Sequence, residues 1–247
     1  MKKLLYLCAA LSLVLPMKAY AYSQSDVTRL LSYGSCPNGD LTGAQLQAED
    51  LTGADLTGAD LSHANLKDAL LENATLTDAN LTKANLQKAY LTGANLDGAD
   101  FSYADLSKAY LNKSSLVGAN GFRANLSHAL LSFANLYTAQ MQEANFDYAN
   151  GYLSNFHSAN VASAWFYKAD LRSANLSSTN MYNAKLQNVN LSEANLKNAN
   201  LTNAILRNGN LTRAELTDAT LDNVDMLNTN LEDARLSTSS LKNIDRN

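Results

Sequence analysis

Basic and aromatic side chains recur in this sequence at a 20-residue interval. The motif Lys-Ala-Tyr-Leu occurs at residues 88–91 and again at 108–111. The lysine of the first motif and every twentieth residue after it form one series of positions: Lys88, Lys108, His128, Tyr148 and Lys168. Cations beside aromatic rings can bind an anionic or sugar-like molecule, or a protein surface. These residue types therefore indicate a surface that binds another molecule.

A second series lies two residues further along and is apolar: Leu70, Tyr90, Tyr110 and Leu130. Trp165 and Tyr167 would extend the basic series, and Phe133, Tyr152 and Leu153 the apolar series. If residues 20 apart are neighbours, both series meet at one corner of the molecule. The predicted binding residues are Lys88, Tyr90, Lys108, Tyr110, His128, Leu130, Tyr148, Trp165 and Tyr167. The alternative is that stacked Tyr and Leu side chains only strengthen contacts between layers.

Residues suited to catalysis or metal binding do not converge. The three histidines, His63, His128 and His157, fall at different phases of the 20-residue interval, so we expect them on three faces. They could not then share a metal ion or a catalytic triad. The sequence contains no glycine-rich phosphate loop and no paired cysteines. We predict no enzymatic activity, no cofactor and no metal site.

The element that must position these side chains is a five-residue repeat. Its 41 units run in unbroken register over residues 39–243, with Leu at 31 of the 41 central positions. Two positions earlier, Ala occupies 31 of the 41 units, and the residue between Ala and Leu is mostly Asn or Asp. On a helix, leucines five apart would scatter around the cylinder. A short extended segment followed by a bend instead points the Ala and the Leu inward.

The units Ala54-Asp55-Leu56-Thr57-Gly58 and Ala194-Asn195-Leu196-Lys197-Asn198 resemble the pentapeptide-repeat family. The resemblance implies an all-β fold, a right-handed quadrilateral β-helix in which four units form one 20-residue coil. About ten such coils would form a rod on the order of 50 Å long. Because Gly121 lies between Phe101 and Met141 at this interval, we expect its two large neighbours to fill the space at its centre.

Residues 1–21 are typical of an export signal. Two lysines at residues 2–3 precede an apolar run over 4–15, and alanines at 19 and 21 suit cleavage before Tyr22. The apolar run is too short to cross a bilayer, and no later run is as apolar, so no transmembrane span is expected. The mature protein is predicted to be periplasmic or secreted.

The two ends of the repeat differ. Residues 22–38 are predicted to form an N-terminal cap with a short helix, whose N-cap would be Ser25 or Asp26. Leu31 and Cys36 share the register of the core, so Cys36 is expected to be a small core residue. Only a tail of residues 244–247 follows the last unit. We expect the C-terminal coil either to fray or to form a homodimer with another copy.

Three functions are compatible with this organisation, and none of them is enzymatic. A rigid interaction scaffold or binding module for a protein, anionic or glycan partner is favoured, because a rod offers surface without an active site. A self-assembling structural component of the envelope is the alternative. The resemblance also implies a third candidate, a DNA mimic that inhibits topoisomerases. Removing Lys2, Lys3 and Lys18 leaves 16 − 23 = −7, spread over four faces, which argues against mimicry and against nucleic-acid partners.

Overall fold

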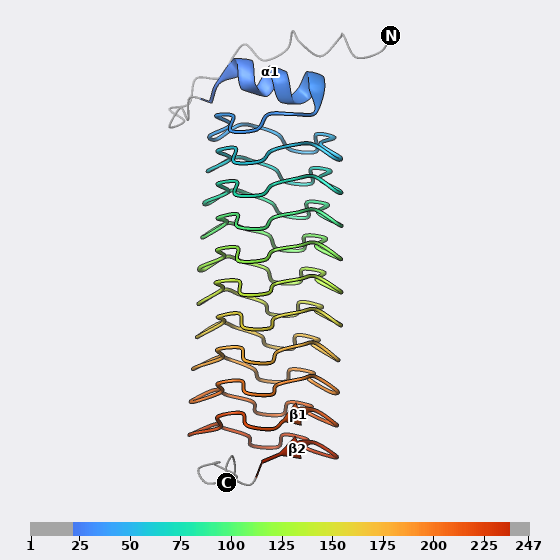
Figure 1. Cartoon of the computed structure of the whole chain (residues 1–247), viewed down its shortest axis with the longest axis vertical. Coiled ribbons are helices and arrows are strands. Elements are labelled where there is room, and N and C mark those ends of the chain that lie inside the picture. Colours follow the sequence, from blue (N-terminus) through green and yellow to red (C-terminus); the bar gives the residue numbers. More distant parts are fainter. Residues whose placement is uncertain (1–21, 238–247) are drawn as a thin grey trace.

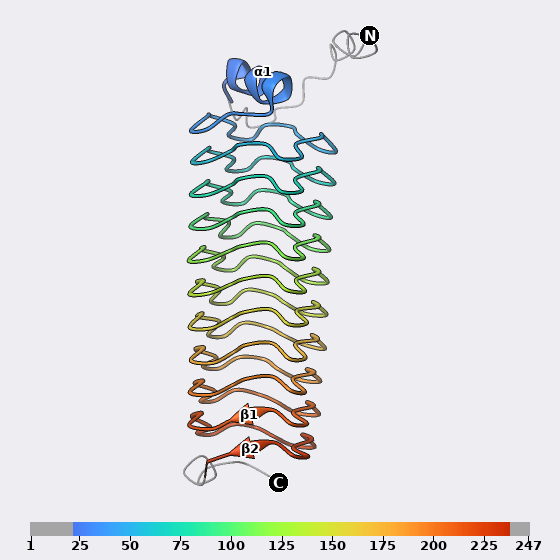
Figure 2. The same ribbon diagram turned by 45° about the vertical axis from the view of Figure 1, so that its right-hand side comes forward.

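The computed structural model describes residues 22–237, which form a rod of stacked coils (Figures 1 and 2). Helix α1 (Gln24–Tyr33) lies across one end of the stack. Two short strands, β1 (Glu215–Leu216) and β2 (Arg235–Leu236), lie in neighbouring coils near the other end and pair in parallel. The predicted export signal and the tail at residues 244–247 lie outside the described residues. No helix within residues 22–237 has the length and apolar character needed to span a membrane.

The length of one coil confirms the predicted 20-residue interval. Parallel bridges join residues 20 apart along the whole stack, from Ser35 with Asp55 to Asn210 with Asn230. The backbone bonds run in both directions between coils. The N–H of Leu71 donates to the carbonyl of Tyr90 at 2.7 Å, and the N–H of Tyr90 donates to the carbonyl of Ala69 at 2.9 Å. Four five-residue units therefore close one turn of the rod.

The interior of the rod is built from the central residue of each unit and the residue two positions before it. These Leu and Ala side chains are buried almost without exception, as the repeat predicts. Ala fits beside the larger side chain because each coil encloses little space. At Gly121 a β-carbon would overlap Sδ of Met141 and lie 2.5 Å from Cε2 of Phe101. The two neighbouring layers therefore fill the space that Gly121 leaves, as expected.

A hydrogen-bonded turn forms each corner of the coil. The N–H of Ala59, for example, donates to the carbonyl of Leu56 at 3.0 Å. The third residue of these turns has positive φ throughout, as in Lys88 (57°) and Gly98 (68°). The Asn or Asp before the central residue supports the turn, because its side-chain oxygen accepts the N–H two residues later. Asp55 Oδ1 accepts from the N–H of Thr57 at 3.1 Å and from its hydroxyl at 2.7 Å, which lowers the pKa of Asp55.

The N-terminal helix departs from the predicted N-cap and from the five-residue register. Its N-cap is Ser23, whose hydroxyl accepts the N–H of Asp26, so neither Ser25 nor Asp26 holds that position. Leu30, 1% exposed, packs into the core, whereas Leu31 is 47% exposed. The five-residue register does not extend back into the helix, because an α-helix turns every 3.6 residues. Cys36 is buried as predicted, and its Sγ accepts a hydrogen bond from Nη2 of Arg29 at 3.1 Å.

Candidate functional site

The two predicted series form two rows along the rod. The basic row comprises Lys88, Lys108, His128, Tyr148 and Lys168, and the apolar row comprises Leu70, Tyr90, Tyr110 and Leu130. Members of the apolar row pair in successive coils through parallel bridges. The rings of Tyr90 and Tyr110 are stacked, with centroids 4.6 Å apart and planes 3° from parallel. The predicted neighbour relations are correct, while a binding role for the rows remains a prediction.

The basic row continues the same stacking and adds cations to it. His128 and Tyr148 are stacked with centroids 4.8 Å apart, and Tyr148 meets Tyr167 edge to face at 5.5 Å. The Lys168 ammonium lies 5.8 Å from the centroid of the Tyr148 ring and 5.3 Å from that of Tyr167. This part of the rod therefore offers aromatic surface with a positive charge held against it.

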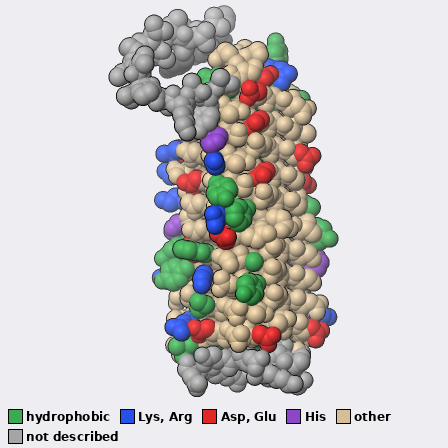
Figure 3. All heavy atoms as spheres, turned by 90° about the vertical axis from the view of Figure 1, so that its left-hand side faces the viewer, with side chains coloured by type: hydrophobic (Ala, Val, Ile, Leu, Met, Phe, Trp, Pro, Cys, Tyr) green, Lys and Arg blue, Asp and Glu red, His purple; other side chains and the backbone are tan. Residues whose placement is uncertain are grey.

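The lysines nearer the N-terminus on this row are exposed and lack an ion pair within the described residues. Lys88 and Lys108 are exposed at left-handed corner positions. No ion pair joins either of them to a carboxylate within residues 22–237. Figure 3 shows one side of the rod, on which side chains stand in rows along the axis and hydrophobic and basic side chains gather in the middle section.

The predicted extension of the apolar side also forms. Phe133 and Tyr152 meet edge to face with centroids 5.9 Å apart, and the Arg172 guanidinium lies 5.6 Å from the centroid of the Tyr152 ring. Leu153 beside them is exposed. Arg172 also binds the carboxylate of Asp170, with Nη2 2.8 Å from Oδ2. The charge of Arg172 is therefore balanced locally, in contrast to that of Lys88 and Lys108.

Trp165 stands apart from the ring clusters. It is 53% exposed, and within the described residues its indole stacks on no other ring. It lies between two surface hollows. The larger one, termed the Trp165 hollow, has a volume of about 540 Å³, and its lining residues are Asp147, Trp165, Tyr167, Lys185, Gln187, Asn188, Arg207 and Asn208. A second hollow of about 530 Å³ on the other side of Trp165 is lined by Arg123, Glu143, Asn145, Ser163, Trp165, Asn183 and Lys185.

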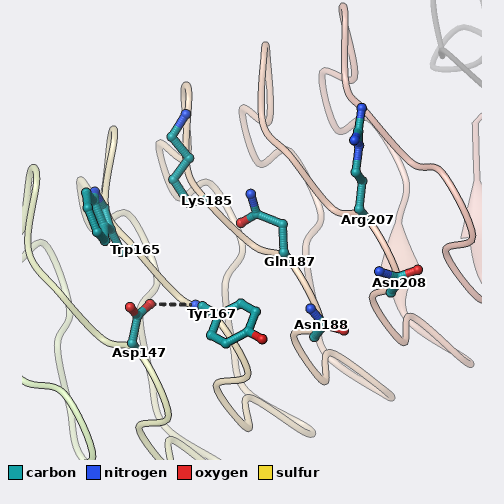
Figure 4. A pocket seen from close by; sticks show the side chains of 8 residues that line it. All are labelled: Asp147, Trp165, Tyr167, Lys185, Gln187, Asn188, Arg207 and Asn208. Atoms are coloured by element: carbon teal, nitrogen blue, oxygen red, sulfur yellow. Dashed lines mark hydrogen bonds between the residues drawn. The ribbon is translucent and has the colours of Figure 1, made fainter.

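The Trp165 hollow crosses four successive coils. Figure 4 shows Trp165 and Tyr167 toward one end, Arg207 and Asn208 at the other, and Lys185, Gln187 and Asn188 between them. Of the lining residues, sequence analysis selected only Trp165 and Tyr167. The others could have been found by following the rows of those two residues, since Lys185 follows Trp165, and Gln187 follows Tyr167, at the 20-residue interval.

The charges in the Trp165 hollow are unequally paired. Arg207 donates from Nε to Oδ2 of Asp225, so that cation is balanced. Asp147 accepts the backbone N–H of Tyr167 at 2.7 Å, and burial raises the pKa of the Asp147 carboxyl despite that bond and the nearby His128. Lys185 has no ion-pair partner among residues 22–237. Lys185 and Asp147 are therefore the two charged groups of the hollow that have no ion-pair partner among residues 22–237, and Lys185 is the cation.

Groups suited to metal binding do not gather on the described part of the rod. Within residues 22–237 no cluster of three or more His, Cys, Asp or Glu side chains could hold an ion. The ring of His157 instead stacks on Tyr137 with centroids 5.6 Å apart, and its Nδ1 lies 2.7 Å from the hydroxyl of Ser177. Each of these contacts joins His157 to a neighbouring coil, which is a structural role.

Comparison with solved structures finds similar proteins. HetL of Nostoc sp. strain PCC 7120, described as a pentapeptide repeat protein involved in heterocyst differentiation regulation, is 27% identical, covering 87% of this chain and 95% of HetL, with a TM-score of 0.41. QnrB1, described as a plasmid-mediated fluoroquinolone resistance protein, is 17% identical, covering 71% of this chain and 92% of QnrB1, with a TM-score of 0.59. The match to QnrB1 supports the right-handed quadrilateral β-helix.

Comparison with family profiles covers most of the sequence. A profile described as pentapeptide repeats matches residues 40–78, 79–118 and 122–150, and one described as a pentapeptide repeat region matches residues 159–236. A search among curated proteins found no match. The profile matches and the 20-residue coil agree, and the chain belongs to the pentapeptide-repeat family.

Proposed function

We propose that this protein is an exported, non-catalytic interaction scaffold in the periplasm or outside the cell, and that α1 caps the first coil. The observation that carries this proposal is the separation of roles within each unit. Core positions are filled by Leu and Ala, while the outward positions hold the basic row and the apolar row on a backbone that is bonded coil to coil. Such a surface can bind a partner without rearranging the core.

Two other functions fit the structure less well. The free lysines of the basic row, Lys88 and Lys108, place positive charge where a DNA mimic would need concentrated negative charge. A self-assembling envelope component would depend on pairing through the C-terminal coil, where the segment from residue 238 onward lies outside the described residues. The exposed aromatic and basic rows favour a partner that binds the side of the rod.

Replacing the stacked tyrosines tests the binding role. We expect Tyr90→Ser with Tyr110→Ser to remove capture of crosslinked envelope partners while the β-type circular dichroism and the Tm stay close to those of the native protein. The matched control changes two exposed tyrosines outside the apolar row, Tyr103→Ser with Tyr182→Ser, and should leave capture unchanged.

Quantitative mass spectrometry of the captured proteins gives the comparison. Unchanged capture by the Tyr90 and Tyr110 variant would contradict a binding role for the apolar row. A large drop in Tm for that variant would instead show that the stacked rings act as contacts between coils.

A further inference from the structure

We propose that the Trp165 hollow binds an acidic saccharide, with one sugar ring against the indole of Trp165 and its carboxylate at Lys185. This inference rests on the proposed function, since it names a partner class for the same side of the rod. The hollow spans three coil spacings, roughly 14 Å along the axis. Its length follows the rod, so an extended chain molecule fits it better than a compact one.

The first argument comes from the exposed indole. Trp165 is the only tryptophan of the chain, is about half exposed and has no aromatic partner among the described residues. Exposed tyrosines such as Tyr90 and Tyr148 stack on another ring, whereas the neighbours of Trp165 in its row are the non-aromatic residues Asn145 and Lys185. A half-exposed indole that lines a hollow offers flat apolar surface to a ligand, and the C–H face of a sugar ring is complementary to it.

The second argument comes from the polar side chains of the hollow. Gln187, Asn188 and Asn208 carry amides, each with two N–H donors and an oxygen acceptor. Sugar hydroxyls also both donate and accept hydrogen bonds, so amides are better partners for them than side chains that can only donate or only accept. The Asp147 carboxylate uses one oxygen for the N–H of Tyr167, which leaves its other oxygen as an acceptor. The lining therefore matches a polyhydroxylated ligand.

The third argument selects a ligand with a negative charge. Lys185 pairs through the backbone with Trp165 in the next coil, and its side chain lines both hollows that flank the indole. The guanidinium groups nearby are already balanced, that of Arg207 by Asp225 and that of Arg123 by Glu143, whose Oε2 lies 2.7 Å from Nε. A ligand carboxylate placed at Lys185 would balance the charge of this lysine. That position is away from the Asp147 carboxylate, which lies at the end of the hollow nearest Tyr167.

Tryptophan fluorescence tests this proposal, because the single tryptophan reports on the site. The probes are tetragalacturonate, a mannuronate tetrasaccharide and a hyaluronan tetrasaccharide, each titrated into the full chain. We expect at least one of them to produce a saturable change in Trp165 emission. Its methyl ester, which keeps the rings but removes the charge, should bind roughly ten-fold more weakly, because the charge-assisted bond to Lys185 is lost.

Two test variants and one control variant are compared by isothermal titration calorimetry. Trp165→Ala and Lys185→Met should each weaken binding of the responding probe by roughly ten-fold or more. Lys197→Met removes an exposed lysine from another corner and should leave binding unchanged. Circular dichroism of each variant would show whether the rod is intact. Equal loss with Lys197→Met would show that the probe responds only to net charge, which contradicts the proposed site.

Other ligand classes are outcomes of the same experiment. Polyglutamate and oligodeoxythymidylate carry negative charge without the sugar acid. If either changes the Trp165 emission as strongly as the best saccharide, the site binds anions or single strands generally, and the proposal is wrong. If none of the three acidic saccharides binds, the proposal is also wrong. The scaffold function would then still depend on the separate result for Tyr90 and Tyr110.

Discussion

Each five-residue unit divides its side chains between an inward pair and an outward three, and the size of the inward pair sets the limits on sequence. At one position, large central residues in two neighbouring coils are balanced by a small one between them. The small residue is Gly121, whose missing side chain is replaced by Phe101 from one neighbouring coil and Met141 from the other. Packing at this position is therefore balanced along the axis of the rod, as close-packed interiors require.

Filling that space should destabilise the protein. We expect Gly121→Ala to lower the free energy of unfolding by about 1–3 kcal/mol, because the new methyl group overpacks against Phe101 and Met141. Denaturant unfolding followed by circular dichroism would measure the loss. Adding Phe101→Leu should make the loss smaller than the sum of the two single changes. A Gly121→Ala variant as stable as the native protein would contradict this description of the core.

At the scale of elements, the role proposed for α1 is to protect the end of the stack. The side chain of Leu30 packs into the core. The N–H of Ser23 donates to the carbonyl of Asp40 at 3.0 Å, and the N–H of Asp40 donates to Oδ2 of Asp26 at 3.1 Å. These bonds join the helix to the coil beneath it. These contacts support the proposed cap, which would cover apolar side chains and backbone groups that an open end of the solenoid exposes.

The neighbouring leucines of α1 offer a matched test of this covering role. We expect Leu30→Ala, which empties a buried site, to lower the free energy of opening of the first coil by about 2–5 kcal/mol. Leu31→Ala, at an exposed site, should change it by about 0.5 kcal/mol or less. Hydrogen exchange at the amide of Leu41, which donates to the carbonyl of Asp60, reports this opening. Equal protection in both variants would show that α1 does not hold the coil.

The sequence alone was sufficient to predict those features of the fold that follow a single repeat length. The five-residue register of Leu and Ala and the 20-residue series through Tyr90 and Tyr110 are both present in the structure. The N-cap was predicted wrongly because Ser23, Ser25 and Asp26 are all suitable capping residues, and only the path of the chain into the first coil selects Ser23. The left-handed corners were not predicted, although several glycines occupy that position.

The candidate site includes features that the sequence alone could not predict. The stacked rows follow from the 20-residue interval alone. The Trp165 hollow instead depends on the relative sizes of side chains in four successive coils and on which charges pair. The pairing of Arg207 with Asp225 joins residues 18 apart, between two different rows. A single periodicity does not specify such diagonal contacts, so Lys185 could be recognised as the unbalanced cation only from the structure.

At the scale of the whole molecule, the residue number determines where a side chain lies. The number of complete 20-residue coils before it sets its position along the axis of the rod, and its place within the coil sets the face on which it lies. A shift by one 20-residue interval moves a side chain one coil along the same row, and a shift by half that interval moves it to the opposite corner. All the surface assignments, including the two rows and the Trp165 hollow, depend on this relation.

Distances between paired spin labels test that relation most directly. In a Cys8→Ser, Cys36→Ala background, labels at Thr82→Cys and Thr202→Cys share one row and are six coils apart, so pulsed electron resonance should give a distance of roughly 29 Å. Labels at Thr82→Cys and Thr212→Cys lie on opposite corners and should give a longer distance. Equal distances for the two pairs, or a same-row distance far from roughly 29 Å, would contradict the 20-residue coil and the surface built on it.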